Sequence, residues 1–227
     1  MQSRQEIAPG VHLISEYNPR IGITFNQYLL LDEQPTLISA GSVQMVEGIR
    51  RCIDEVTDVR GLRYIVVPHF EADECGALTT WQGLAPAVEP VVGAVCCRQL
   101  SGFGLTNRVK VVEDGEVVEL GRMRLRCLTV GAEMHLWDGI IVYEESGRIL
   151  FSSDFFSQRG ETPLQGPAFT ESLVGMFKMS MPSPAKAVAL LEKVRGLSIR
   201  MIATGHGFPI TESIPSYFDA VGMACLS

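Results

Sequence analysis

The sequence predicts an α/β protein with an αββα sandwich, in which two β-sheets pack face to face and helices cover their outer faces. Two observations predict this fold. Strand-like and helical segments alternate in the first hundred residues, and a later run of short strands is followed by helices and one more strand. Two sheets that each carry helices on one face bury such a pattern well. With 227 residues, of which 46% are hydrophobic, we expect a single domain over residues 1–227.

The first half of the chain contains apolar runs of strand length separated by helical segments. Strands are expected at residues 11–15, 23–31, 36–39, 62–67 and 91–95, and helices at residues 46–56 and 76–84. The first helix is predicted because apolar residues recur at helical spacing, namely Val46, Ile49, Ile53 and Val56. Residues 62–67 are apolar apart from Arg63, which is typical of a strand covered on both faces.

The second half changes from strands to helices. Short strands are expected at residues 109–112, 116–119, 123–129, 139–143 and 148–152. Turn signals such as Asp114-Gly115 and Ser146-Gly147 separate some of these strands. The segments that follow are expected to be helices at residues 172–179 and 184–194, a strand at 200–203 and a last helix at 213–224.

The composition argues against several classes of function. A net charge of −7 disfavours non-specific binding of nucleic acid, which needs a basic face. No stretch approaches the roughly 20 apolar residues of a membrane span, and the N-terminus lacks the apolar core of a signal peptide. The six cysteines are irregularly spaced, which indicates buried thiols in a reducing cytoplasm, with Cys96-Cys97 as a redox pair the lesser alternative. We therefore expect a cytoplasmic protein that contacts neither nucleic acid nor membrane.

Side chains that bind metals follow apolar strands at four places. His69, Glu71 and Asp73 occupy every second position after residues 62–67, so they converge if the backbone there stays extended. The candidates that follow three other strands are His135, Asp154 and His206. Open α/β sheets build their sites at the carboxyl ends of strands. A single histidine at a strand end is usually an ordinary surface or core residue, but four such junctions predict a metal site.

Three imidazoles and three carboxylates are more ligands than one tetrahedral zinc ion takes. They suit two metal ions roughly 3.5–4 Å apart, with Asp154 as the best candidate for a shared ligand and Glu74 as a further candidate ligand. The carboxylate-rich set favours iron or manganese over a thiolate-type zinc site. The fourth histidine, His12, lies in an early strand apart from the other candidates and is interpreted as structural.

Apolar side chains flank the candidate ligands in the sequence, and they are Phe70, Met134, Trp137, Phe155 and Phe156. Two interpretations are open for them: the lining of a pocket that suits a small diatomic ligand, and ordinary core packing beside loops. Asp138 is a candidate for orienting a neighbouring imidazole, since ligating histidines commonly donate their second nitrogen to a carboxylate.

At these positions the sequence resembles the metallo-β-lactamase fold superfamily, and within it the diiron domain of flavodiiron proteins and the stand-alone oxygen-binding diiron proteins. The family pattern is H-x-E-x-D-H followed by His, Asp and His. Residues 69–73 match its first five positions, the spacing from His135 to Asp154 is typical of the group, and His206 matches the closing histidine. The sequence differs where Glu74 replaces the family histidine and where Ser39 replaces an aspartate found in many relatives.

The resemblance implies a set of ligands and cofactors. His69, Glu71, His135 and Asp154 would hold a first iron, and Asp73, Asp154 and His206 a second. The expected cofactors are two iron ions (Fe²⁺/Fe³⁺) with bridging oxo, hydroxo or peroxo species and no flavin within this chain. No catalytic residue is expected beyond the metal ligands.

The resemblance also implies a function, which is the binding of dioxygen or of nitric oxide. The protein would act either as a sensor that reports to a signalling partner or as an oxygen or nitric oxide reductase supplied by an external redox donor, so whether it is an enzyme stays open. A dinuclear zinc hydrolase is the alternative from another class, although hydrolytic relatives usually carry histidine where this chain has Glu71. A scaffold for protein contacts alone is a third interpretation, and a homodimer is one alternative for the oligomeric state.

Overall fold

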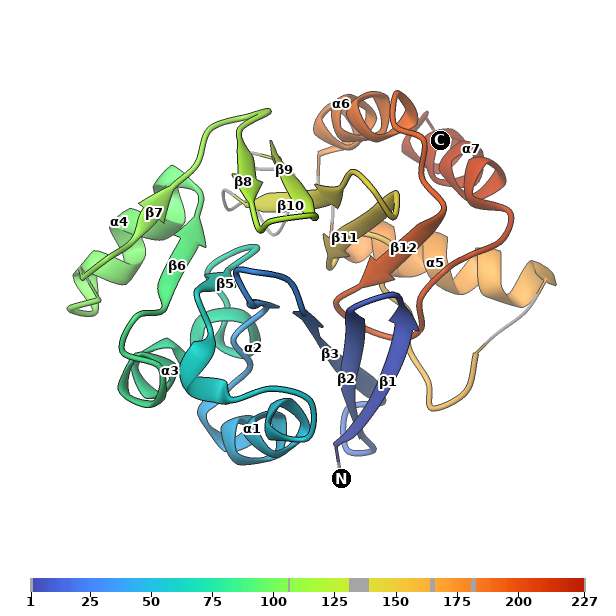
Figure 1. The fold of residues 1–227 in the computed structure, drawn as a ribbon. Helices are drawn as coiled ribbons and strands as arrows, with labels where there is room; N and C mark the ends of the chain where they lie inside the picture. Colours follow the sequence, from blue (N-terminus) through green and yellow to red (C-terminus); the bar gives the residue numbers. More distant parts are fainter. Residues whose placement is uncertain (1, 106, 131–138, 164–165, 181–182, 227) are drawn as a thin grey trace.

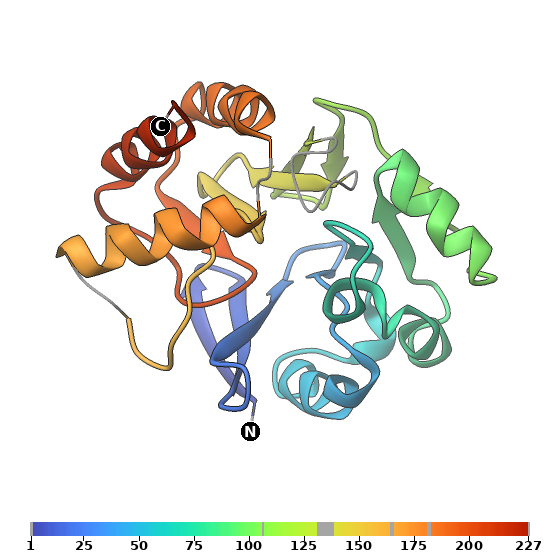
Figure 2. The same ribbon diagram turned by 180° about the vertical axis from the view of Figure 1, so that it is seen from behind.

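The computed structural model describes residues 2–105, 107–130, 139–163, 166–180 and 183–226. Two β-sheets pack face to face and helices lie on both outer faces, which confirms the predicted αββα sandwich (Figure 1). The view from behind shows the same two halves, with the helices of the two layers on opposite sides of the molecule (Figure 2).

The first sheet contains seven strands in the order β1-β2-β3-β4-β5-β6-β7. Their bounds are β1 (Ser3–Ala8), β2 (Val11–Asn18), β3 (Ile23–Leu30), β4 (Thr36–Ile38), β5 (Tyr64–Val66), β6 (Glu89–Val92) and β7 (Lys110–Val111). Strands β1 to β4 pair antiparallel, whereas β4 to β7 pair parallel. Parallel neighbours end at the same edge of a sheet, so the segment after β5 leaves at the edge where β4 and β6 also end.

The second sheet contains five strands in the order β12-β11-β10-β9-β8. Their bounds are β8 (Val117–Glu119), β9 (Arg124–Thr129), β10 (Ile140–Glu144), β11 (Ile149–Ser153) and β12 (Met201–Thr204). The pair β11 and β12 is parallel, and the other neighbours in this sheet are antiparallel. The segments that follow β11 and β12 therefore leave the sheet side by side, and they carry Asp154 and His206.

Helices cover the outer face of each sheet (Figures 1 and 2). The α-helices are α1 (Val46–Asp54), α2 (Ala72–Cys75), α3 (Leu78–Leu84), α4 (Ala94–Gly102), α5 (Gly166–Ser180), α6 (Pro184–Arg195) and α7 (Ile214–Leu226), and the 3-10 helices are η1 (Val43–Met45) and η2 (Val59–Gly61). Helices α1 to α4 lie on the side of the first sheet and α5 to α7 on the side of the second (Figure 1).

Three buried apolar layers follow from this architecture. One lies between the first sheet and its helices and includes Ile49 and Trp81. A second lies between the second sheet and α5 to α7 and includes Leu173. The third lies between the two sheets and includes Tyr28 and Phe151, whose rings meet edge to face at 5.2 Å. Burial of apolar surface in these layers is the main force that holds the two sheets together.

The structure differs from the predicted elements at several places, for example where the helix expected at residues 172–179 begins at Gly166. Strand β1 was not expected because Ser3–Ala8 is mostly polar, and it forms because it pairs with β2 at the edge of the sheet. The expected strand at residues 91–95 ends at Val92, and α4 begins at Ala94. The expected helix at residues 76–84 begins later, at Leu78, and a separate short helix, α2, precedes it.

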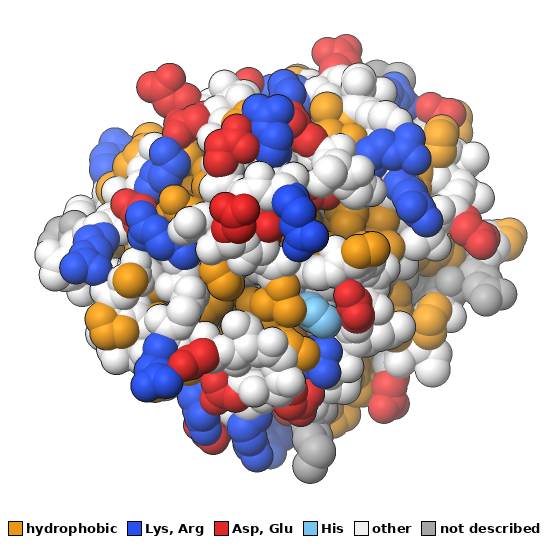
Figure 3. Space-filling view, viewed as in Figure 1, with side chains coloured by type: hydrophobic (Ala, Val, Ile, Leu, Met, Phe, Trp, Pro, Cys, Tyr) orange, Lys and Arg blue, Asp and Glu red, His pale blue; other side chains and the backbone are white. Residues whose placement is uncertain are grey.

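The surface carries interspersed charges of both signs (Figure 3). Several of them pair, for example Arg124 with Glu119 at 3.1 Å and Lys110 with Glu116 at 2.7 Å. Along the described parts of the chain, no helix combines the length and the apolar character that crossing a membrane requires.

Candidate metal centre

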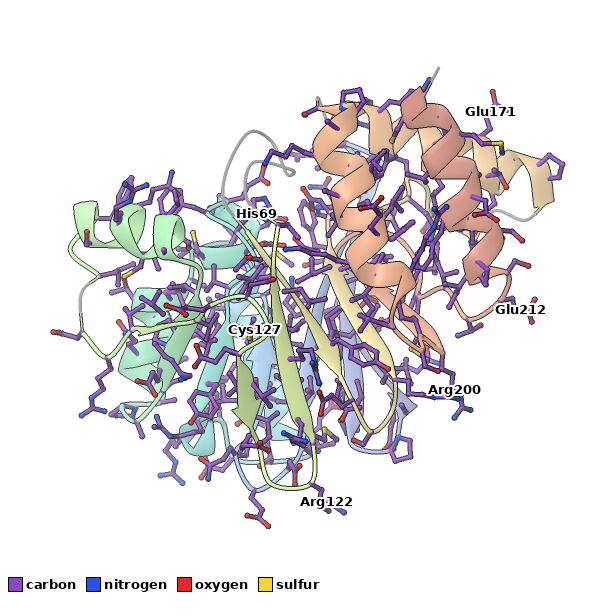
Figure 4. The ribbon with its side chains drawn as sticks, turned by 90° about the horizontal axis from the view of Figure 1, so that it is seen from above. His69, Arg122, Cys127, Glu171, Arg200 and Glu212 are labelled. Carbon is purple, nitrogen blue, oxygen red and sulfur yellow. The ribbon has the colours of Figure 1, made fainter. Side chains whose placement is uncertain are left out.

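The predicted ligands that the structure describes gather at one end of the sandwich. His69 follows β5 of the first sheet, whereas Asp154 and His206 follow β11 and β12 of the second. Figure 4 shows His69 at one end of the two sheets and Arg122 at the opposite end. A bridge between His69 and Gly139 joins the two sheets beside the cluster. The site therefore depends on the packing of one sheet on the other.

The first group of candidate ligands consists of His69, Glu71 and Asp154. Their ligand atoms all lie within 4.8 Å of one another, a spacing that one metal ion can span. The Nε2 atom of His69 lies 2.7 Å from Oε2 of Glu71 and 3.8 Å from Oδ2 of Asp154. His69 and Asp154 are buried, whereas the side chain of Glu71 is 45% exposed. Glu71 therefore forms the rim of this group.

The second group of candidate ligands consists of His206, Asp154 and Asp73. The Nε2 atom of His206 lies 3.1 Å from Oδ1 of Asp154 and 3.6 Å from Oδ2 of Asp73. Asp154 thus presents one oxygen to each of the two imidazoles. The described residues supply two imidazoles and three carboxylates in two adjoining groups, and this donor set fits a pair of metal ions with a shared carboxylate.

The backbone around these ligands does not stay extended, so that part of the prediction was wrong. Glu71 is extended, with φ −135° and ψ 155°, but α2 begins at the next residue. Asp73 nevertheless reaches the second group, because the first turn of α2 directs it toward His206. Two hydrogen bonds fix this turn, from Ser39 Oγ to the carbonyl of Asp73 at 3.1 Å and from the Ala40 N–H to the carbonyl of Glu74 at 2.8 Å.

Glu74 is buried and lies on the other side of the His69 ring from Glu71. Its Oε2 atom is 2.7 Å from Nδ1 of His69 and accepts a hydrogen bond from the His69 backbone N–H at 2.8 Å. Its Oε1 atom accepts a hydrogen bond from Ser153 Oγ at 2.5 Å. Both oxygens of this candidate ligand are therefore engaged with His69 and Ser153.

Strand β3 holds the turn that carries His206. The carbonyl of Thr24 lies 3.1 Å from Nδ1 of His206, and the Phe25 ring meets the His206 ring edge to face at 5.3 Å. The Asn26 side chain donates to the carbonyls of Thr204 and Gly207, each at 2.9 Å. These β3 residues were not predictable from the sequence, because no local pattern connects a strand to a turn about 180 positions away.

The net effect of burial and crowded carboxylates is to raise the pKa values of three side chains in the cluster. Burial alone would lower the pKa of His69, but the charge of Glu74 and hydrogen bonds to Glu71 and Glu74 outweigh it and raise that pKa well above its usual value. Burial likewise opposes the protonation of His206, yet Asp154 and Asp73 raise its pKa to about 9. Burial and the charge of Glu74 raise the pKa of Asp73 to about 6. The site therefore favours positive charge, whether it comes from protons or from metal ions.

A groove of about 830 Å³ leads to the cluster. Glu71, Asp73 and His206 form its polar end, and Tyr17, Ile23, Phe25 and Met45 are among the apolar residues that line the rest. Of the two interpretations open for the apolar side chains near the candidate ligands, core packing applies to those that the structure describes. Phe155 and Phe156 are buried in the core beneath α5 to α7, and Phe70 packs against the first apolar layer and the Phe103 ring.

The other residues singled out from the sequence lie outside the described part of the chain or apart from the two candidate ligand groups. His135, Met134, Trp137 and Asp138 lie outside the described residues. His12 sits on β2 with its Nδ1 atom 3.0 Å from Arg4, and it takes no part in either ligand group. Cys96 and Cys97 are not joined by a disulfide, and Cys96 is fully buried.

Comparisons with known proteins show what this chain is similar to. Residues 23–207 match the family described as "ODP family beta lactamase". A putative diflavin flavoprotein A 2 of Synechocystis sp. is 26% identical over 204 residues, which cover 85% of this chain and 34% of that protein. An anaerobic nitric oxide reductase flavorubredoxin of Salmonella arizonae is 23% identical over 204 residues, which cover 85% of this chain and 43% of that protein. The chain thus spans about a third to two fifths of the length of these relatives.

Solved structures share the fold. The rubredoxin oxygen:oxidoreductase of the anaerobe Desulfovibrio gigas superposes with a TM-score of 0.89 at 18% identity, covering 99% of this chain and 62% of that chain. A fragment of a putative diflavin flavoprotein A 5 of Nostoc sp. superposes with a TM-score of 0.87 at 18% identity, covering 99% of this chain and 95% of that chain. At these identities the superpositions establish the fold.

Proposed function

Because the chain belongs to the ODP family of the metallo-β-lactamase superfamily, in its diiron branch, we propose that it is a non-haem diiron protein that binds dioxygen or nitric oxide. The observation that carries this proposal is the arrangement of Asp154. Its two carboxylate oxygens face two different imidazoles, His69 at 3.8 Å and His206 at 3.1 Å. A carboxylate between two imidazoles is suited to a ligand that two metal ions share.

The residues divide into two sets of proposed iron ligands. His69, Glu71 and Asp154, together with His135, would bind one ion, and Asp73, Asp154 and His206 the other. Two ferrous ions would supply electrons and open coordination positions for a diatomic ligand. The buried side chains of His69 and Asp154 form the floor of the site and exclude water from that side. Glu71 lies at the rim of the site and faces the groove. A small ligand would therefore enter past Glu71.

The names of the relatives support the choice of ligand. One is called an anaerobic nitric oxide reductase and another a rubredoxin oxygen:oxidoreductase. Two versions of the proposal follow. In the first, the site binds dioxygen and reports its occupancy to a signalling partner; in the second, a separate redox donor supplies electrons and the diatomic ligand is reduced. We favour the first version and place the protein, as a single diiron domain over residues 1–227, in a reducing cytoplasm.

A dinuclear zinc hydrolase remains the second candidate because of the groove. A volume of about 830 Å³ exceeds what a diatomic ligand needs and would accept a larger substrate. Glu71 favours the diiron proposal, because a carboxylate in this ligand position is more typical of an iron site than of a histidine-rich zinc site.

Anaerobic loading with ferrous iron, followed by exposure to air and absorption spectroscopy, tests the proposal. A long-lived coloured species is expected for a binding or sensing protein. Colour that bleaches rapidly and returns only with continuous reductant would indicate the reductase. The absence of any spectral change in a protein that holds two equivalents of iron would contradict both versions and leave the hydrolase.

A further inference from the structure

The position of Glu74 requires an explanation of its own. Its side chain is 5% exposed, and a buried carboxylate is costly unless hydrogen bonds compensate it. Among the described residues, Glu74 is close to the proposed metal ligands, yet its oxygens are directed at the far side of His69. The question is what a carboxylate accomplishes there.

Three donor groups contact the two oxygens of Glu74. The His69 N–H and Nδ1 both contact Oε2, at 2.8 Å and 2.7 Å, and the Ser153 hydroxyl donates to Oε1 at 2.5 Å. Ser153 has φ 51°, the left-handed region that non-glycine residues rarely adopt. That conformation occurs at the end of β11, directly before Asp154. The strand end that supplies the shared carboxylate thus also supplies a donor to Glu74.

The contact with Nδ1 determines which nitrogen of His69 faces the metal position. The two ring nitrogens are distinct, and the hydrogen bond made by one sets the role of the other. With Nδ1 directed at Glu74, the Nε2 atom is directed at Glu71, 2.7 Å away, and Asp154, 3.8 Å away. A carboxylate behind a ligating histidine is a common way to orient the ring and to increase its basicity.

We propose that Glu74 is a positioning residue that holds His69 with Nε2 toward the metal, and that it is not itself a ligand. This inference rests on the proposed metal site but is independent of the identity of the metal and of the gas. Ser153 completes the arrangement by holding the second oxygen of Glu74. The position that carries a histidine in the family pattern has thereby acquired a different task in this chain.

The first test is a titration of the metal-free protein with cobalt(II), followed by its visible absorption. Glu74→Gln keeps the size of the side chain but turns one acceptor oxygen into an NH₂ group that faces a donor. The affinity for the ion at His69 is expected to fall about 10- to 100-fold. Glu144→Gln is the matched control, because Glu144 is also buried and accepts hydrogen bonds from the Ser146 N–H and Gly147 N–H. It lies at the end of β10 remote from Gly139 and is expected to leave the cobalt affinity unchanged.

A double-mutant cycle distinguishes positioning from ligation. If Glu74 acts through His69, Glu74→Gln has no further effect on cobalt affinity in a His69→Ala background, and it is additive with His206→Ala. If Glu74 is instead a ligand of the second ion, Glu74→Gln has no further effect on cobalt affinity in the His206→Ala background, and the inference is wrong. Ser153→Ala, which keeps Glu74, is expected to lower the affinity for the same ion to a smaller extent. The test therefore does not depend on the folding of Glu74→Gln.

The second test is ¹⁵N NMR of the diamagnetic zinc-loaded protein labelled at histidine. A proton on Nδ1 of His69, slow to exchange with solvent, is expected in the unsubstituted protein and identified by its loss in His69→Ala. Its exchange should accelerate in Glu74→Gln and not in Glu144→Gln. A proton on Nε2, or an exchange rate that Glu74→Gln does not change, would refute the inference. Zinc binding that passes this test while iron gives no colour in air would refute only the proposed function.

Discussion

At the scale of single residues, the metal-free cluster stabilises protonated imidazoles among carboxylates. The pKa of His206 is raised to about 9 because Asp154 and Asp73 outweigh the effect of burial, and His69 is raised by Glu74 and Glu71. A metal ion binds only a neutral imidazole nitrogen, so each ion must displace these protons. Metal ions and protons therefore compete for the same side chains.

This competition predicts a pH dependence with a definite sign. Metal affinity should rise as the pH increases from 6 to 9, because fewer protons remain to be displaced from His206. Without metal, the stability that the raised pKa of His206 contributes is fully present below its unfolded value of about 6.5 and is lost as the pH rises through about 9. Zinc competition titrations and urea unfolding across this range measure both effects. An affinity that is constant from pH 6 to 9 would contradict the assignment of His206.

The meeting of the candidate ligands could be predicted from the sequence, but the orientation of Glu74 could not. The types and spacing of His69, Glu71, Asp154 and His206 were enough to predict that they meet, because strand ends of one sandwich converge. The orientation of Glu74 toward Nδ1 of His69 was not predictable, because it depends on Ser153, a residue from the other sheet with a left-handed backbone.

At the scale of elements, the segments that follow β11 and β12 approach each other closely at two glycines. The Gly205 N–H donates to the Ser153 carbonyl at 2.7 Å, and a Cβ on Gly205 would lie 3.0 Å from the Ser153 backbone. Gly207 has φ 88°, and a Cβ there would lie 2.7 Å from Cβ of Gln158. These glycines hold the His206 turn against the loop that carries Asp154.

Gly207→Ala should therefore destabilise the protein by about 1–3 kcal/mol and weaken metal binding, because the turn must shift and His206 with it. Gly83→Ala is the control. Gly83 lies on the exposed face of α3, where a Cβ meets nothing within 4 Å, so alanine should be neutral or stabilise by up to about 1 kcal/mol. Urea unfolding and zinc titration of both variants check this; equal stability of the two would show that the turn is not constrained.

Elements were predicted well where the apolar pattern was strong, and poorly where hydrogen bonds to other parts of the chain determined the local structure. Strands β2 and β3 and helix α1 follow directly from their apolar residues. Strand β1 has a polar sequence and is a strand because it hydrogen-bonds to β2. Helix α2 was missed because alternation of His69, Glu71 and Asp73 suggested extended backbone, whereas hydrogen bonds from Ser39 and Ala40 fix a helical turn there.

At the scale of the whole molecule, the candidate metal centre is a product of sheet packing. The inter-sheet layer joins β3 to the second sheet, where Tyr28 packs on Phe151 and donates from its hydroxyl to the carbonyl of Thr204 at 2.7 Å. The same strand holds the His206 turn through Thr24 and Asn26. Stability of the inter-sheet layer and geometry of the site are therefore linked.

Phe151→Ala should test this link. Loss of a buried phenylalanine is expected to cost about 3–5 kcal/mol of unfolding free energy. Because the substitution would leave a cavity beneath the ends of β11 and β12, zinc affinity should fall as well. Leu173→Ala, in the layer under α5, is the comparison, since it should cost about 2–5 kcal/mol without a comparable loss of affinity. An equal loss of affinity in both variants would mean that general destabilisation, and not the inter-sheet layer, controls the site.

The central claim is that one carboxylate, Asp154, is shared by two metal ions, and metal stoichiometry tests it most directly. Iron is measured in protein loaded without oxygen, for the unsubstituted chain, for Asp154→Ala, and for Asp219→Ala as an exposed control whose carboxylate pairs with Arg195. The account predicts two equivalents in the unsubstituted chain and in the control, and fewer than two in Asp154→Ala. Two tightly bound equivalents in Asp154→Ala would contradict it.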